Sequence, residues 1–195
     1  MRNTRRSVFS GAVVICLLAL AVLLGYITDR MLTNLEKEIY PTDFSEQVTA
    51  CAEQYDLDVH IIYALIKELS DFSSNHVSDD GRIGLMQLSE ETFLWLTAER
   101  LQENLDAGLL YEPKTNIRYG CHYLLYLTTR YESWDAVYAA YLCGTDTVDA
   151  WYQDSATKDL DFEIQDQNIL KKVNKIQRTV DKYKKLYDSK GDVTS

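Results

Sequence analysis

The stretch that decides the fold is I-I-Y-A-L-I-K-E-L-S-D-F-S-S-N-H-V-S-D-D-G-R-I-G-L-M-Q-L-S-E-E-T-F, from Ile61 to Phe93. Its first part predicts an amphipathic helix, because apolar residues recur at intervals of three and four. The buried stripe consists of Ile62, Leu65, Ile66 and Leu69. Glu68 lies on the flank, and a polar turn on Gly81 follows, since Asn, Asp and Gly tolerate tight backbone geometry. We expect a second helix to start at Gly84. A carboxylate at a helix end beside such a loop is a candidate acid.

A longer and more specific pattern runs through the same stretch. It consists of Ala64, Ile66, Ser70, Phe72, Ser78, Gly81, Gly84, Leu85, Met86, Gln87 and Leu88. These residues resemble the core of lytic transglycosylases of the soluble-lytic-transglycosylase (SLT) type, whose pattern reads A-[LV]-I-x-x-E-S-x-F, then S-x-x-G-A-x-G-L-M-Q-L. Further matches are Tyr40-Pro41, Asn116-Ile117 with Gly120, and Ala139-Ala140-Tyr141 with Gly144. The resemblance covers about residues 40–187 and implies an all-α, lysozyme-like (goose-type/SLT) domain that acts on peptidoglycan glycan strands.

The rest of the chain also predicts helices alone. No segment alternates apolar and polar residues convincingly over five or more positions, so we expect no β-sheet. Asp58 and Ser89 are expected to cap the helices that follow them. Pro113 opens a long helix through Arg130, and Ser133 caps the next one.

Three positions depart from the family pattern where the family has functional residues. In an ungapped alignment the catalytic Glu of the family falls on Leu69, and Glu68 stands one position earlier. One helical residue is a rotation of about 100°, so Glu68 points elsewhere unless the helix end shifts or one residue is inserted between Glu68 and Phe72. The family's substrate-facing Asn is Leu142 here, and its late E-T-x-x-Y element reads Q-D-Q-N-I at 165–169. This pattern is typical of a retained fold with weakened or lost catalysis.

The resemblance also implies the chemistry and the site. In the family, one Glu protonates the glycosidic oxygen and then acts as base while the muramyl 6-hydroxyl attacks, which leaves a 1,6-anhydro end. Glu68 is the candidate acid, and Ser78, Met86, Gln87 and Tyr141 are the candidate substrate-binding residues. The residue pattern alone allows structural explanations as well. Glu68 can be a solvated helix residue, Met86 can fill the core, and Tyr141 can lie in the core or at its edge.

The N-terminus predicts a membrane anchor. Three arginines precede an uncharged apolar run from Val8 to Ile27, which is long enough to cross a hydrocarbon core of about 30 Å. No small-residue cleavage site follows, and the arginines favour a cytoplasmic N-terminus. A cleaved signal and a buried core helix are the alternatives. The predicted organisation is a cytoplasmic tail 1–7, a transmembrane anchor 8–27, a stalk 28–40, the lytic-transglycosylase-like domain 41–188 outside the membrane, and a tail 189–195.

Composition limits the partners. The chain has 20 Lys+Arg against 30 Asp+Glu, an acidic balance that argues against nucleic acid. Neither Cys-x-x-Cys nor a His cluster is present, so we predict no metal and no cofactor. Cys51, Cys121 and Cys143 lie outside the predicted anchor and allow at most one disulfide among them. Basic residues gather in the last helix, from Lys171 to Lys185, as a solvated face or a docking strip for an acidic partner.

Two functions follow from these observations. The protein is an active lytic transglycosylase that uses Glu68, or a non-catalytic relative that binds glycan strands or scaffolds a wall-assembly partner. The predicted partners are peptidoglycan glycan strands and the membrane, and a protein partner cannot be named from the sequence. A third possibility is a domain that no longer acts on peptidoglycan.

Overall fold

The computed structural model describes residues 3–157 and 162–188. The chain divides into two compact units, Met1–Pro41 and Thr42–Ser195. The first unit is one long helix, α1 (Asn3–Ile39), within which Val14–Ile39 is long and apolar enough to cross a membrane, as a signal sequence also can be. The predicted anchor and stalk are therefore continuous in this helix, which ends just before Pro41. Arg2 and the predicted tail 189–195 lie outside the described residues.

The second unit is built from helices, which confirms the predicted all-α class. Within its described residues, strand-like pairing is limited to isolated bridges that Ile83 makes with Val77 and Leu88. The elements are α2 (Ser45–Tyr55), α3 (Val59–Ser70), α4 (Glu90–Trp95), a π-helix (Leu96–Arg100), a 3-10 helix (Ala107–Tyr111), α5 (Pro113–Arg130), α6 (Trp134–Cys143), α7 (Thr145–Thr157) and α8 (Gln167–Tyr187).

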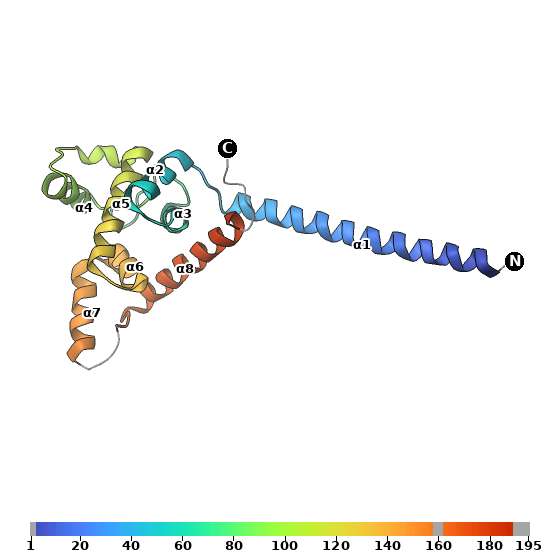
Figure 1. Cartoon of the computed structure of the whole chain (residues 1–195). Coiled ribbons are helices and arrows are strands. Elements are labelled where there is room, and N and C mark those ends of the chain that lie inside the picture. Colours follow the sequence, from blue (N-terminus) through green and yellow to red (C-terminus); the bar gives the residue numbers. More distant parts are fainter. Residues whose placement is uncertain (1–2, 158–161, 189–195) are drawn as a thin grey trace. The chain divides into compact units, whose positions relative to one another are not determined.

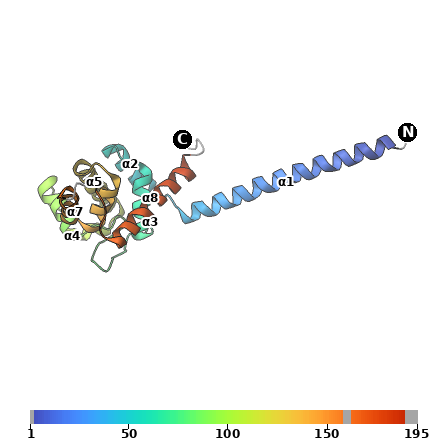
Figure 2. The same cartoon turned by 90° about the horizontal axis from the view of Figure 1, so that it is seen from below.

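Helix α3 occupies a central place in this unit. It packs against α2 and, more extensively, against α8, although α8 comes last in the sequence (Figures 1 and 2). Helix α6 contacts α5, α7 and α8. Ile62, Leu65 and Ile66 of the predicted apolar stripe are fully buried. Leu69, the fourth member of that stripe, is only partly buried because it sits where α3 meets the loop.

The predicted helix caps are present. The Asp58 carboxylate accepts a hydrogen bond from the backbone N–H of His60 at 2.9 Å. The hydroxyls of Ser89 and Ser133 accept from the backbone of Thr92 and Ala136 at 3.1 and 3.2 Å. Each cap satisfies one of the amide groups that a helix start leaves without an intrahelical partner.

The prediction that a second helix starts at Gly84 is wrong. The segment from Ile83 to Leu88 is a tight turn, closed by backbone hydrogen bonds in both directions between these two residues at 2.9 and 3.2 Å. Gly84 and Gln87 have positive φ angles of 82° and 51°, which a right-handed helix cannot contain. Helix α4 therefore begins only at Glu90, after the Ser89 cap.

Candidate functional site

A cavity of about 280 Å³ lies where the end of α3 meets α6, α8 and the loop between α3 and α4. It brings together three predicted site residues, Glu68, Ser78 and Gln87, with Leu69 beside them. The complete lining is Glu68, Leu69, Ser78, Asp80, Arg82, Gln87, Leu142, Lys172, Lys175 and Ile176. Two of the sequence departures, Leu69 and Leu142, therefore face the same space.

The carboxylate of Glu68 points toward α8. The hydroxyl of Thr179 donates to Glu68 Oε1 at 2.7 Å, and the ammonium of Lys175 lies 2.6 Å from Oε2. The Glu68 side chain is only 10% exposed, so it is not the solvated helix residue that the pattern alone suggests. Both carboxylate oxygens are engaged by one helix, which makes Glu68 a tie between α3 and α8.

Helix α5 supports the loop between α3 and α4 that lines the cavity. Asn116 is fully buried and makes three hydrogen bonds to it or to its neighbours. Its Oδ1 accepts from the Met86 backbone at 2.7 Å, and its Nδ2 donates to the carbonyls of Ile83 and Leu110 at 2.9 and 2.8 Å. A Cβ added to Gly120 would lie 2.3 Å from Met86 Sδ, so glycine lets the loop approach α5 closely. These contacts account for the Asn and Gly of the sequence pattern.

Two predicted binding residues lie behind the cavity wall. Met86 is fully buried, and Tyr141 is 1% exposed with its hydroxyl donating to the Met86 carbonyl at 2.8 Å. Burial raises the pKa of Tyr141 well above its ordinary value. Neither residue is among those that line the cavity. Both hold the loop in place in this conformation.

Gln87 lines the cavity, and both N–H groups of its side-chain amide are already hydrogen-bonded within the protein. Nε2 donates to the carbonyls of His76 and Gly84 at 3.0 and 2.8 Å, which occupies both N–H groups. Its carbonyl oxygen is the group left to accept a hydrogen bond from a ligand. A donor such as the N–H of an N-acetyl group has the matching chemistry.

Arg82 is a site residue that the sequence reasoning missed. Its guanidinium donates to the carbonyls of Tyr141 and Leu142 at 2.7 and 2.9 Å, and to Asp80 at 3.1 Å. It therefore bridges the loop to the C-terminal end of α6, where the helix dipole favours a cation. A hydrogen bond from Ser78, together with Arg82, lowers the pKa of Asp80. The available signal was that Arg82 stands where the family pattern has Ala.

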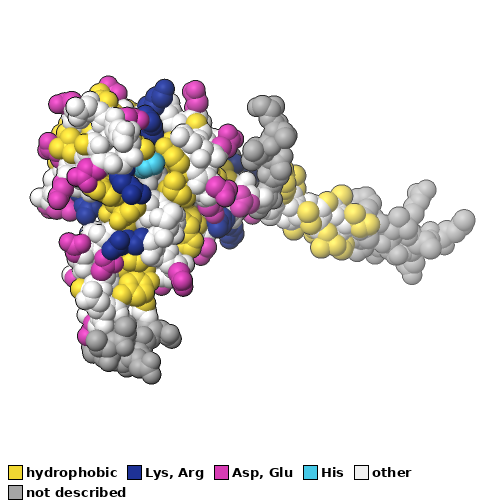
Figure 3. Space-filling view, turned by 60° about the vertical axis from the view of Figure 1, so that its left-hand side comes forward, with side chains coloured by type: hydrophobic (Ala, Val, Ile, Leu, Met, Phe, Trp, Pro, Cys, Tyr) yellow, Lys and Arg dark blue, Asp and Glu magenta, His cyan; other side chains and the backbone are white. Residues whose placement is uncertain are grey.

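A larger, shallower groove of about 1080 Å³ runs between α4 with its π-helix and the α6–α7 junction. Its lining includes Trp95 and Tyr126, whose rings pack edge to face 4.9 Å apart. The guanidinium of Arg100 lies over both rings, 5.7 and 5.2 Å from their centres. Glu91, Glu99 and Asp146 add acidic groups. Figure 3 shows one face of the domain, with acidic side chains spread around its edge and hydrophobic side chains between them.

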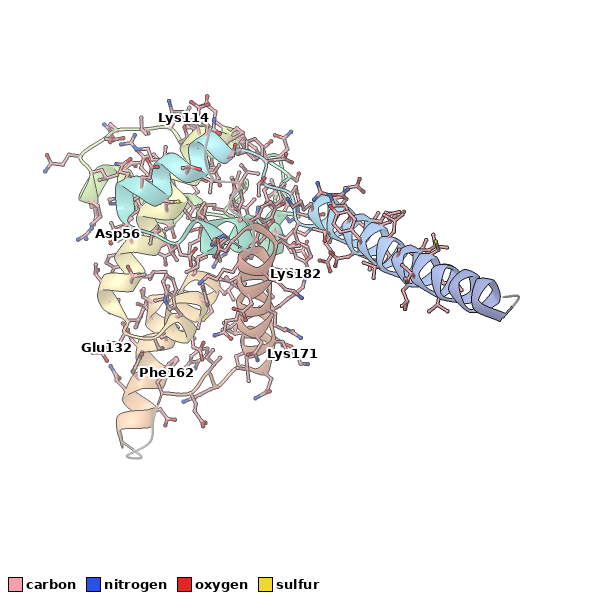
Figure 4. The ribbon with its side chains drawn as sticks, turned by 45° about the vertical axis from the view of Figure 1, so that its right-hand side comes forward. Asp56, Lys114, Glu132, Phe162, Lys171 and Lys182 are labelled. Atoms are coloured by element: carbon pink, nitrogen blue, oxygen red, sulfur yellow. The ribbon has the colours of Figure 1, made fainter. Side chains whose placement is uncertain are left out.

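The described residues contain no group of three or more His, Cys, Asp or Glu side chains that could hold a metal ion. The basic residues of α8 are distributed along the helix, with Lys171 near its start and Lys182 toward its end (Figure 4). In this helix, Lys175 binds Glu68 and Lys184 binds Asp58.

The sequence matches the model of a known protein family. The sequence model of the family described as Transglycosylase SLT domain matches residues 46–163. The chain belongs to this family. The matched SLT segment includes α3, the loop with Gly84 and Gln87, and α5 and α6, and ends before α8.

Solved structures show the same fold. A structure of the lytic transglycosylase Slt from Pseudomonas aeruginosa, an inactive mutant with Glu replaced by Gln, has a TM-score of 0.68 at 22% identity. The 70 kDa soluble lytic transglycosylase from Escherichia coli has a TM-score of 0.70 at 21% identity, and a complex of that enzyme type with bulgecin A has 0.71 at 21%. The alignments cover 80 to 82% of this chain but only 26 to 27% of those chains. The SLT chain therefore spans about a quarter of the proteins it resembles.

Proposed function

We propose that this SLT domain binds peptidoglycan glycan strands without cleaving them, on the outer face of a bacterial membrane. The observation that supports this proposal is the arrangement at the end of α3. Glu68 is bound by α8 through both carboxylate oxygens, and Leu69, on which the family's acid falls in an ungapped alignment, lines the cavity.

Cleavage in this family needs a carboxylic acid that can give its proton to the glycosidic oxygen. A group in this role must lie within hydrogen-bond reach of the atom that it protonates. Glu68 instead accepts hydrogen bonds from Thr179 and Lys175, so both of its carboxylate oxygens face α8 and are already bound there. Leu69 has no group that can transfer a proton.

Binding does not need the acid. The cavity keeps the Gln87 carbonyl oxygen as an acceptor and places the Ser78 hydroxyl nearby. The neighbouring groove offers Trp95 and Tyr126, aromatic side chains of the kind on which the C–H faces of sugar rings stack. Polar groups in a small cavity beside an aromatic groove favour a carbohydrate over an anionic polymer, which the acidic surface would repel.

A second candidate is an active lytic transglycosylase that uses Glu68. It is favoured by one observation, namely that Glu68 lines the same cavity as Leu69. Lys175 is 67% exposed and can move away without breaking packing, whereas Thr179 is 4% exposed and cannot. Catalysis by Glu68 therefore requires a rotation of the carboxylate away from α8.

One experiment separates these functions. The Thr28–Ser195 fragment is incubated with insoluble peptidoglycan. Centrifugation shows how much protein sediments with the peptidoglycan, and mass spectrometry measures the 1,6-anhydro-muropeptides released. We expect sedimentation without anhydro products. If anhydro products form and the Glu68→Gln variant does not produce them, the protein is an enzyme that uses Glu68. If the protein does not sediment with peptidoglycan, the proposal of glycan binding is refuted. Leu69→Glu, with Leu69→Met as a volume-matched control, tests whether restoring the acid restores cleavage.

Membrane attachment is the other part of the proposal. It is supported by the length and composition of α1, and by the arginines that precede its apolar part. We expect the full chain to stay in the membrane fraction after an alkaline carbonate wash, with an intact mass that includes the N-terminal residues. Release of a shorter soluble protein would identify a cleaved signal instead.

A further inference from the structure

Two cysteines meet in the packing of α2 on α5. Cys51 lies on α2 and is 6% exposed, and Cys121 lies on α5 and is fully buried. The two helices pack directly against each other. Both thiols are free in this structure, and they influence each other: the Cys121 thiol, together with the nearby Arg118, lowers the pKa of Cys51 against the effect of burial. The two sulfurs are therefore neighbours in the folded domain.

The third cysteine outside α1 has a different environment. Cys143 lies at the end of α6, partly exposed, and its thiol donates to the Ala139 carbonyl at 3.1 Å. Sequence reasoning limits the three to one disulfide, and the structure distinguishes among the three pairings. Only Cys51 and Cys121 are brought into side-chain contact among the described interactions.

We propose that Cys51 and Cys121 form a disulfide that ties α2 to α5. Its occurrence in the cell rests on the proposed position of the domain outside the membrane, where disulfides persist. The bond closes a loop of about 70 residues that contains α3, α4 and the site loop. Because Cys121 follows Gly120, the residue that packs on Met86, the link braces the part of α5 that supports the candidate site.

The oxidation balances with a disulfide of a small thiol, such as oxidised glutathione, as the oxidant. The Cys51 thiolate attacks one glutathione sulfur, forms a mixed disulfide and releases one glutathione thiolate. The Cys121 thiol then loses its proton and attacks the sulfur of Cys51, which forms the S–S bond and releases the second glutathione. Two protein thiols are oxidised and one glutathione disulfide is reduced. The exchange takes place while the chain folds, because the two sulfurs are buried afterwards.

The test uses the full chain in detergent. Reduced protein is unfolded in denaturant, refolded with a mixture of oxidised and reduced glutathione, blocked with N-ethylmaleimide and digested with trypsin without reduction. Trypsin places the three cysteines in separate peptides, 38–67 with Cys51, 119–130 with Cys121, and 131–158 with Cys143. We expect mass spectrometry to find the first two peptides joined and the third one alkylated.

Variants supply the second measurement. Closing a loop of this length raises Tm by on the order of 10 °C. We expect a reducing agent to lower the Tm of the oxidised protein by this amount. The difference should vanish in Cys51→Ser and in Cys121→Ser, and remain in Cys143→Ser. Alkylation of all three cysteines, or a link that includes Cys143, would overturn the inference. Neither result depends on glycan sedimentation, so the two proposals fail independently.

Discussion

The tie between Glu68 and α8 leads to a quantitative prediction about stability. If Glu68 acts as a structural link, its removal must destabilise the domain. Glu68→Ala leaves the Thr179 hydroxyl, which is 4% exposed, without its acceptor. A hydrogen bond to a charged group contributes about 1.5–3 kcal/mol. Lys175 is 67% exposed, so solvent screens its ion pair to about 0.2–1 kcal/mol. The contact with Thr179 therefore dominates.

These magnitudes rank four variants. We expect Glu68→Ala to lower the free energy of unfolding by about 2–3 kcal/mol, and Thr179→Val by nearly as much. Lys175→Met should cost less than about 1 kcal/mol. Glu68→Gln keeps an oxygen for Thr179 and should cost about 1 kcal/mol. Urea unfolding of the Thr28–Ser195 fragment at pH 7, followed by circular dichroism and tryptophan fluorescence, measures each value.

Double-mutant cycles identify which contact carries the energy. We expect a coupling of about 1–2 kcal/mol between Glu68 and Thr179, and about 0.5 kcal/mol between Glu68 and Lys175. Catalytic residues often sit in unfavourable surroundings, and their replacement then stabilises the protein. A gain of stability in Glu68→Ala, or no coupling to Thr179, would refute the structural role and favour the active enzyme.

Three further predictions concern the support of the site and of α7. Gly120→Ala forces a methyl group against Met86 and should cost about 1–3 kcal/mol in urea unfolding; an unchanged midpoint would contradict the close approach. Asn116→Ala leaves the buried Met86 N–H and the buried Leu110 carbonyl without their partner, whereas the Ile83 carbonyl keeps the Leu88 N–H; the variant should cost about 2–5 kcal/mol by the same assay, with a smaller loss counting against this account. A hydrogen bond from Arg130 lowers the pKa of Asp149 in the folded state, so this carboxylate stabilises the domain above its unfolded pKa of about 3.9 and stops doing so as pH falls through the lower folded value. Asp149→Asn should therefore lower Tm at pH 7 but not at pH 2. An equal loss of Tm at both pH values would show that the charge of the Asp149 carboxylate is not what stabilises the domain.

The sequence predicted the helices of the domain well because their signals are local. A three- and four-residue apolar period defines the core face of α3, and polar caps mark where α3, α4 and α6 begin. The prediction of a helix at Gly84 was wrong because the spacing of the apolar residues Leu85, Met86 and Leu88 resembles the buried stripe of a helix. Their burial comes from a turn that positive φ angles permit.

The candidate site was predicted only in part, because side-chain partners far apart in sequence decide its chemistry. The register argument placed Glu68 away from the position of the family's acid, but nothing local showed that Thr179 and Lys175 would bind it. Likewise, periodicity cannot tell whether Tyr141 faces a ligand or a backbone carbonyl. Arg82 was missed because an arginine after a turn is usually solvated.

The link from Glu68 to Thr179 also has a consequence for how the domain folds. The two residues are 111 positions apart, and α8 supplies one wall of the cavity. Contacts of such long range form late, because a large loop must close before they contribute. During synthesis, the segment through α6 can pack its local helix pairs while the cavity is still open on one side. Only when α8 docks does the cavity acquire this wall, so the shape of the candidate site depends on a helix that is synthesised after all the others around it.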